Sequence, residues 1–235
     1  MTNAMWKRLG LWAIWFFVVI IGSVFLHEVG HGVGATIDGI HISTGFNKVG
    51  MPDKTPDDPD FRTGMPDGIW SGLLGPIVSW ALAIVFTLAL YQMRRPTPAA
   101  FLVGATAVAN GLLRAAPMTM FLIPALGGQL HVEDEVAWGI WMVTHVFRPD
   151  LSGVTLSEIP PGLLLSYPAV WILPLFSLAI SLACLIFAYR GIFKLEGARM
   201  SHWSVRLLFV ALPVAAWLAA QPVLGALDRV VRINW

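Results

Sequence analysis

The sequence predicts an all-α integral membrane protein with about five transmembrane helices, a sixth as the alternative, and a short β-hairpin after the first helix. Two observations lead to this fold class. Hydrophobic residues make up 57% of the 235 residues and charged residues only 12%, whereas about 25% charged residues is usual in a soluble domain. Several apolar stretches also reach the roughly 20 residues that a helix needs to cross a hydrocarbon core about 30 Å thick.

The first predicted span covers 9–37 and carries no charged side chain before the motif that begins at His27. Its apolar part is too long and too aromatic for a signal peptide, and no clear small-residue cleavage site follows, so we expect it in the mature protein. Further spans are expected at 69–93, 98–126, 162–189 and 205–227. The apolar piece 136–147 is shorter, and its length suits a re-entrant or interfacial helix better than a sixth span.

Two polar connections separate these spans in what we expect to be one membrane-embedded domain, 1–235. The connection 38–67 contains six aspartates and repeated Pro and Gly, which predict turns and a short hairpin around His41 to Val49. The connection 127–161 holds an acidic cluster directly before the short apolar piece. The cluster consists of Glu133, Asp134 and Glu135.

The charge of the chain bears on its location and partners. The net charge is only +1, and a nucleic-acid partner, which usually needs a basic face, is not expected. We expect a multi-pass protein of the cell or inner membrane whose partners are the lipid bilayer and a membrane protein or peptide substrate, with an oligomer or an adaptor protein left open. Lys and Arg flanking the spans number eight on the amino-terminal side and six on the other, a difference too small to decide the orientation.

A metal-binding pattern, His27-Glu28-Val29-Gly30-His31, lies inside the first predicted span. Residues i and i+4 of a helix project from one face, so His27 and His31 can reach the same ion. Glu28 then lies where a general base acts on water without ligating the metal, which is the HExxH arrangement. The alternative is that both histidines form hydrogen bonds across the bundle or bind haem. Because ionisable groups inside a membrane are costly and usually functional, we favour one catalytic Zn²⁺.

A catalytic zinc site needs a third protein ligand and an open position. The extended pattern HExxHxxGxxH is excluded, since Ile37 occupies the place of its third histidine. Spans one and three run in the same direction, so their ends lie on the same side of the membrane. The acidic cluster, which follows span three, therefore lies on the side where the motif ends span one. We favour Asp134, then Glu135, then Glu133. The alternative is that these acids stabilise the first turn of the following helix. Outside candidates are His131, Asp38, His41, Asp150 and Glu158.

Two polar residues in the third span are further candidates. Asn110 could hold a substrate or polarise its carbonyl, and the alternative is a polar contact between helices. Arg114 lies one turn further along and could stabilise an oxyanion, snorkel, or neutralise the acidic cluster. We favour neutralisation for Arg114.

The chain resembles the site-2 protease family of intramembrane zinc metalloproteases. The motif at His27 to His31 matches the HExGH of that family, and Gly75-Pro76 matches a Gly-Pro near the start of its next span. The resemblance implies that Asn110 corresponds to a later Asn of the family and Asp134 to its third zinc ligand. In this chain Asp134 is followed by Glu135 and not by the Gly of the family's Asp-Gly, and Asn110 and Asp134 lie further apart than in the family, so we describe the chain as a divergent member.

Together these patterns predict a zinc-dependent protease that hydrolyses peptide bonds of membrane-associated substrates, with Glu28 as the general base. Two alternatives are a membrane protein that binds or transports metal without hydrolysis, and a zinc hydrolase acting on lipids or other amides. The catalytic use of Glu28 separates the first alternative from the protease.

Overall fold

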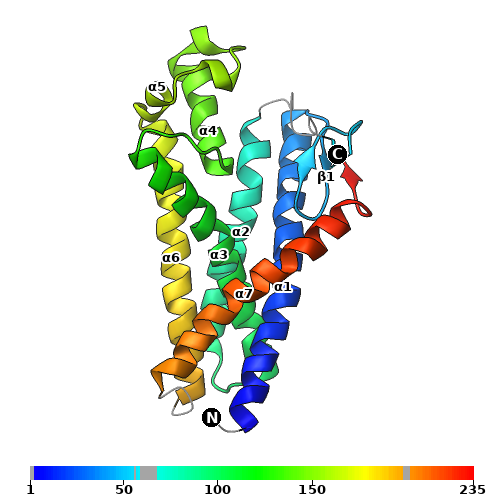
Figure 1. Cartoon of the computed structure of the whole chain (residues 1–235), viewed down its shortest axis with the longest axis vertical. Helices are drawn as coiled ribbons and strands as arrows, with labels where there is room; N and C mark the ends of the chain where they lie inside the picture. Colours follow the sequence, from blue (N-terminus) through cyan, green and yellow to red (C-terminus); the bar gives the residue numbers. More distant parts are fainter. Residues whose placement is uncertain (1–2, 56, 59–67, 198–201) are drawn as a thin grey trace.

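Five long helices form the body of the protein. The computed structural model describes residues 3–55, 57–58, 68–197 and 202–235, and within them five helices are long and apolar enough to cross a membrane (Figure 1). The predicted all-α membrane fold with five spans is confirmed, and these residues contain no sixth span. The helices are α1 (Asn3–Asp38), α2 (Ile69–Gln92), α3 (Pro98–Leu126), α6 (Ala169–Glu196) and α7 (Trp203–Asp228).

The predicted connection 127–161 contains the short helix α4 (Asp134–Met142), which continues as one turn of π-helix over Val143–Phe147. Two 3₁₀ turns, Pro149–Leu151 and Leu156–Glu158, and the short helix α5 (Pro161–Leu165) follow. The expected helix at 136–147 is therefore present, but it begins two residues earlier, with Glu133 as its N-cap.

The fourth predicted span, 162–189, is placed wrongly at both ends. A break at 166–168 separates α5 from the span, because Pro168 lacks an N–H and disfavours helical backbone at the residue before it. The true span, α6, begins at Ala169 and extends to Glu196. Its basic residues Arg190 and Lys194 lie in the last turns, where a cation is favourable at a helix C-terminus.

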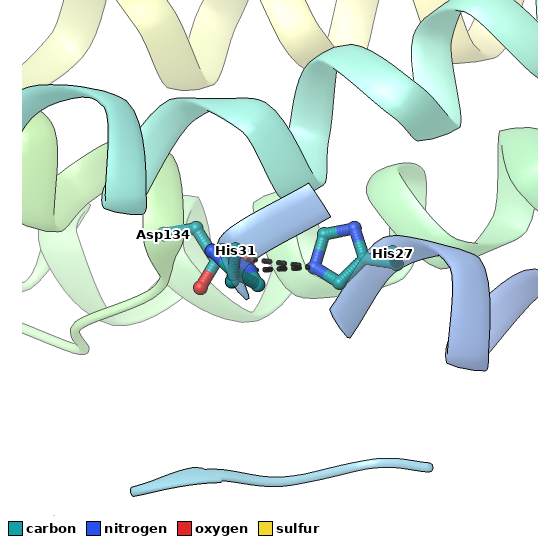
Figure 2. Close-up of side chains that lie close together, drawn as sticks. All are labelled: His27, His31 and Asp134. Carbon is teal, nitrogen blue, oxygen red and sulfur yellow. Dashed lines mark hydrogen bonds and ion pairs between the residues drawn. The ribbon is translucent and has the colours of Figure 1, made fainter. Parts of the chain in front are cut away.

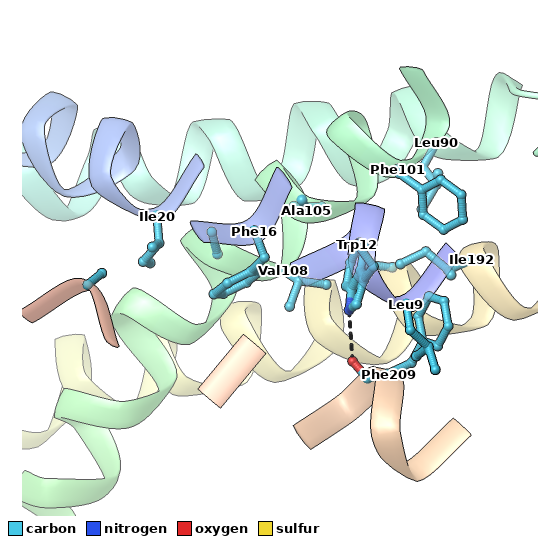
Figure 3. Close-up of a cluster of buried hydrophobic side chains, with 14 of the residues drawn as sticks. Leu9, Trp12, Phe16, Ile20, Leu90, Phe101, Ala105, Val108, Ile192 and Phe209 are labelled. Atoms are coloured by element: carbon cyan, nitrogen blue, oxygen red, sulfur yellow. Dashed lines mark hydrogen bonds between the residues drawn. The ribbon is translucent and has the colours of Figure 1, made fainter. Parts of the chain in front are cut away.

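Helix α1 packs against α2, α3 and α7, and α7 crosses obliquely in front of it (Figure 1). Away from the motif, a large apolar cluster joins α1, α3, α6 and α7 (Figure 3). Trp12 of α1 is fully buried there and donates its indole N–H to the Phe209 carbonyl, 3.0 Å away. This cluster fixes the position of the helix that carries the histidines.

A small sheet lies beside the end of α1 (Figure 1). The predicted hairpin is confirmed, since β1 (Ser43–Thr44) and β2 (Val49–Gly50) pair antiparallel, with Thr44 opposite Val49. A third strand, β3 (Ile233–Asn234), comes from the far end of the chain and pairs antiparallel with the other edge of β1. The remainder of the predicted polar connection, 56 and 59–67, lies outside the described residues.

Candidate metal centre

Three side chains, two from α1 and one from the start of α4, converge beside α2 (Figure 2). The Nε2 atoms of His27 and His31 lie 3.1 Å apart, and Asp134 Oδ2 lies 3.1 Å from the first and 3.6 Å from the second. Metal bonds of about 2.0–2.2 Å at tetrahedral angles separate ligand atoms by about 3.3–3.6 Å. These three atoms, His27 Nε2, His31 Nε2 and Asp134 Oδ2, form a triangle that has nearly the dimensions one zinc ion requires.

Both histidines are oriented by partners on α2. The ring Nδ1–H of His31 donates to the Ser71 carbonyl, which leaves Nε2 facing His27 and Asp134. His27 Nδ1 lies 3.1 Å from the buried Ser79 hydroxyl, which can hold that ring with Nε2 facing the same point. Partners of this kind select the tautomer and orientation of a metal-ligating histidine. The sequence carries no pattern that would have identified these two serines.

Asp134, the first residue of α4, completes the triangle. Burial raises the pKa of its carboxyl, but His31, His27 and Arg114 outweigh that effect and hold the pKa well below its usual range. The carboxyl is therefore ionised at neutral pH, which is the form that binds a metal. Its side chain is 32% exposed, against 10% and 9% for the histidines, so the triangle is open on the Asp134 side.

Arg114 binds the acidic cluster, in agreement with the neutralising role predicted for it. Its Nε and Nη2 lie 3.0 and 2.6 Å from the two carboxylate oxygens of Glu135, which is fully buried. Its Nη1 lies 3.1 Å from Asp134 Oδ2 and 3.1 Å from His27 Nε2. Ser177 of α6 donates to Glu135 as well, at 2.6 Å. Glu135 therefore pairs with Arg114, and this pair keeps the guanidinium beside the triangle.

The donor atoms at this point suit a zinc ion. The two imidazoles of His27 and His31 and the carboxylate of Asp134 converge among helices that are otherwise apolar. Ionisable groups in such surroundings are costly and usually functional. Two imidazoles with one carboxylate form a donor set that zinc commonly takes.

The other predicted residues have different partners. Asn110 is fully buried, and its amide donates to Ser23 Oγ and to the Thr106 carbonyl, both at 2.9 Å, so the structure supports the helix contact that was its alternative role. Asn110 does not line the cavity at the triangle. The remaining candidates bind elsewhere: Glu133 with His131, Asp38 with the Ser71 N–H, His41 with Trp235, Asp150 with Arg148, and Glu158 in the cap at Thr155.

A cavity of about 410 Å³ opens directly onto the triangle. Glu28 lines it together with His27, His31 and Asp134. Its other walls come from the hairpin segment, from the start of α2, from α3 and α4, and from α7, which contributes Trp217 and Gln221. The two α7 residues could not be identified from the sequence, since nothing in their spacing distinguishes them from an ordinary lipid-facing span.

Gly75 provides the space that the His31 ring occupies. A Cβ at Gly75 would collide with that ring, and a Cβ at Gly30 would lie 2.7 Å from the Leu74 carbonyl oxygen. Gly75→Ala should therefore displace His31 and weaken zinc binding by about 10–100-fold, as loss of an orienting contact does. The matched control is Gly72→Ala on the same helix, where a Cβ meets nothing within 4 Å. Competition titration with a zinc chelator measures both, and equal affinities would contradict this packing role.

Glu135 should be essential for stability. Glu135→Ala leaves the buried Arg114 guanidinium without its bidentate partner, and breaking a buried pair in this way costs about 3–5 kcal/mol. Thermal unfolding of the purified protein in detergent should show a large decrease in Tm. Asp150→Ala removes an exposed partner of Arg148 and serves as the control, with no measurable change expected. A Tm of Glu135→Ala equal to that of the control would contradict the buried pair.

No family model matches the chain, and comparison with curated proteins and with solved structures also found no match. The function of the protein is therefore inferred from the geometry and chemistry of its own residues.

Proposed function

We propose that this protein is an integral membrane zinc metalloprotease that hydrolyses peptide bonds of membrane-associated substrates. The observation that carries the proposal is the triangle of His27, His31 and Asp134, with Glu28 one residue from the first ligand and lining the same cavity. A donor set without a general base would serve binding or transport equally well. The presence of Glu28 beside it favours hydrolysis.

Each residue of the site has its own role in this proposal. His27, His31 and Asp134 would hold Zn²⁺, which when bound lowers the pKa of a water molecule toward about 7 and polarises a carbonyl. Glu28 takes a proton from the attacking water and delivers it to the leaving amine. Arg114 holds Asp134 in place through its Nη1. Since a helix hides its carbonyls, the substrate segment enters the cavity in an unwound or extended form.

Metal content and metal dependence test the proposal together. Purified protein should contain about one zinc per chain by elemental analysis. Incubated with solubilised membrane proteins, it should generate new peptide amino termini, detected by mass spectrometry after terminal labelling. Removal of the metal by a chelator should abolish them, and added Zn²⁺ should restore them. Protein without a stoichiometric divalent metal, or cleavage that is indifferent to the chelator, would refute the proposal.

A further inference from the structure

The residues that follow α7 pack against the hairpin segment, which lines the cavity. The segment Asp228–Trp235, which we call the strap, runs from the end of α7 along the hairpin segment 40–54 (Figure 1). Within it, β3 pairs with β1, with Ser43 opposite Asn234 and Thr44 opposite Ile233. The strap thus contacts a part of the chain about 180 residues earlier, as the spacing of 182 between Phe46 and Asp228 shows.

Asp228 binds the turn between β1 and β2. Its carboxylate is 1% exposed, and one oxygen accepts the backbone N–H groups of Phe46 at 2.7 Å and of Asn47 at 2.8 Å. A charge-assisted bond to a backbone N–H is stronger than a neutral one. Gly45 allows this approach, because a Cβ there would collide with the same carboxylate.

Arg232 holds the outer part of the segment. Its Nε donates to Ser43 Oγ at 3.0 Å and its Nη2 to the Met51 carbonyl at 3.2 Å, while Nη1 donates to the Lys54 carbonyl. These carbonyls follow β2, where the chain leaves the sheet. One guanidinium therefore joins the beginning of β1 to the turn after β2.

Trp235 connects the strap to the metal-binding helix. Its backbone N–H donates to the Ile42 carbonyl at 3.0 Å, and its indole N–H donates to Thr44 Oγ1 at 2.7 Å. The indole lies against Gly32, the residue directly after His31, and a Cβ at that position would overlap the ring. The hairpin is thereby held at a defined place relative to the histidines.

This arrangement matters because the hairpin segment is a wall of the cavity. Ile42, Asn47 and Val49 line the cavity together with the triangle. The two strands of the hairpin have two residues each, and even a longer isolated hairpin is only marginally stable in water. The strap holds this wall through Asp228, Arg232 and Trp235, and Phe25 of α1 also stacks on Phe46 of the hairpin segment.

We propose that the strap positions the substrate-binding wall of the cavity, with Asp228 and Trp235 as positioning residues that hold Ile42, Asn47 and Val49 against an extended peptide. The inference rests on the proposed function, because it assigns the cavity to a peptide substrate. Neither Asp228 nor Trp235 belongs to the triangle, so loss of the strap weakens peptide binding and leaves zinc binding unchanged.

Two hydroxamates separate these effects. Acetohydroxamate probes the metal alone, whereas a peptidyl hydroxamate with apolar side chains also contacts the cavity wall. Asp228→Ala should weaken the binding of the peptidyl hydroxamate by about tenfold, because the backbone N–H groups of Phe46 and Asn47 lose their acceptor. It should not change acetohydroxamate affinity or zinc content. Asp228→Asn should recover part of the loss, since its Oδ1 can accept the same bonds.

The control is Arg229→Ala in the same segment. Arg229 pairs with Asp57, and the two side chains are 66% and 63% exposed, so its loss should change neither affinity. Hydrogen exchange of the metal-free protein provides a readout that does not depend on zinc. Peptides covering 42–50 should exchange faster in Asp228→Ala than in wild type, and at the wild-type rate in Arg229→Ala.

Unchanged exchange and unchanged peptidyl hydroxamate affinity in Asp228→Ala would overturn the role of the strap. An equal loss for both hydroxamates would overturn it too, because the strap would then act on the metal centre. If Asp228→Ala does not fold, Asp228→Asn decides by the same two comparisons. Failure of the wild type to bind either hydroxamate would refute the proposed function and the substrate role of the strap, while exchange still reports whether the strap orders the hairpin.

Discussion

Glu28→Gln should abolish peptide hydrolysis while the protein keeps its zinc. General base catalysis contributes about 10²–10⁴-fold to a rate, and the amide of Gln cannot accept the proton of the attacking water. The two histidines and Asp134 are untouched, and Gln has nearly the shape of Glu. We therefore expect full zinc content by elemental analysis together with a loss of new amino termini of at least about 100-fold.

The control for this variant is Glu158→Gln, which changes an exposed glutamate in a cap outside the cavity and should retain wild-type cleavage. Wild-type cleavage in Glu28→Gln would contradict the role of Glu28 as the base. A metal-dependent function other than cleavage that survives in Glu28→Gln would instead favour the non-hydrolytic alternative, in which the protein binds or transports metal.

Asp134→Ala should remove the metal. The change deletes one of three ligands and leaves two histidines, which cannot close the site on one side. Loss of a partner that only orients a ligand already weakens metal affinity by about 10–100-fold, so loss of a ligand should exceed about 100-fold. Zinc content after dialysis should fall to a small fraction of that in wild type, and Co²⁺ added to the variant should lack the absorption of a tetrahedral site.

Glu133→Ala is the matched control, since it removes the carboxylate directly before Asp134 in the sequence. Glu133 pairs with His131 at 3.0 Å and is not part of the triangle, so this variant should retain its zinc. Full zinc occupancy in Asp134→Ala, or zinc loss in Glu133→Ala instead, would show that the third ligand has been assigned wrongly.

The helical part of the fold could be predicted because membrane helices follow from a local property, the length of an apolar run. The second and third spans are found within one residue of their predicted ends, where Arg94 and Pro98 mark the boundaries. The break before Ala169 was missed because Leu163 to Ile172 is apolar on both sides of Pro168. Strand β3 could not be predicted, since two residues carry no periodicity and its partner lies far away in the sequence.

Some residues of the candidate site could likewise be predicted from the sequence, and others could not. His27, Glu28 and His31 could be identified because a single helix places all three, whereas the assignment of Asp134 needed topology, the parallel direction of the first and third spans. Arg114 could be assigned to the acidic cluster because a guanidinium in a membrane must be paired. Ser71, Ser79 and the strap act through contacts that only the folded chain creates, and their residue types are common in any connection or span.

The distances along the sequence have a consequence for synthesis. Asp134 lies 107 residues after His27, and Asp228 lies 181 residues after Asn47. A ribosome therefore delivers the two histidines to the membrane with the first span, Asp134 only after two more spans, and the strap later still. On the proposed function, a chain whose synthesis stops early carries the motif but neither a closed metal site nor a formed substrate wall. Unfinished chains would then be harmless to their membrane neighbours.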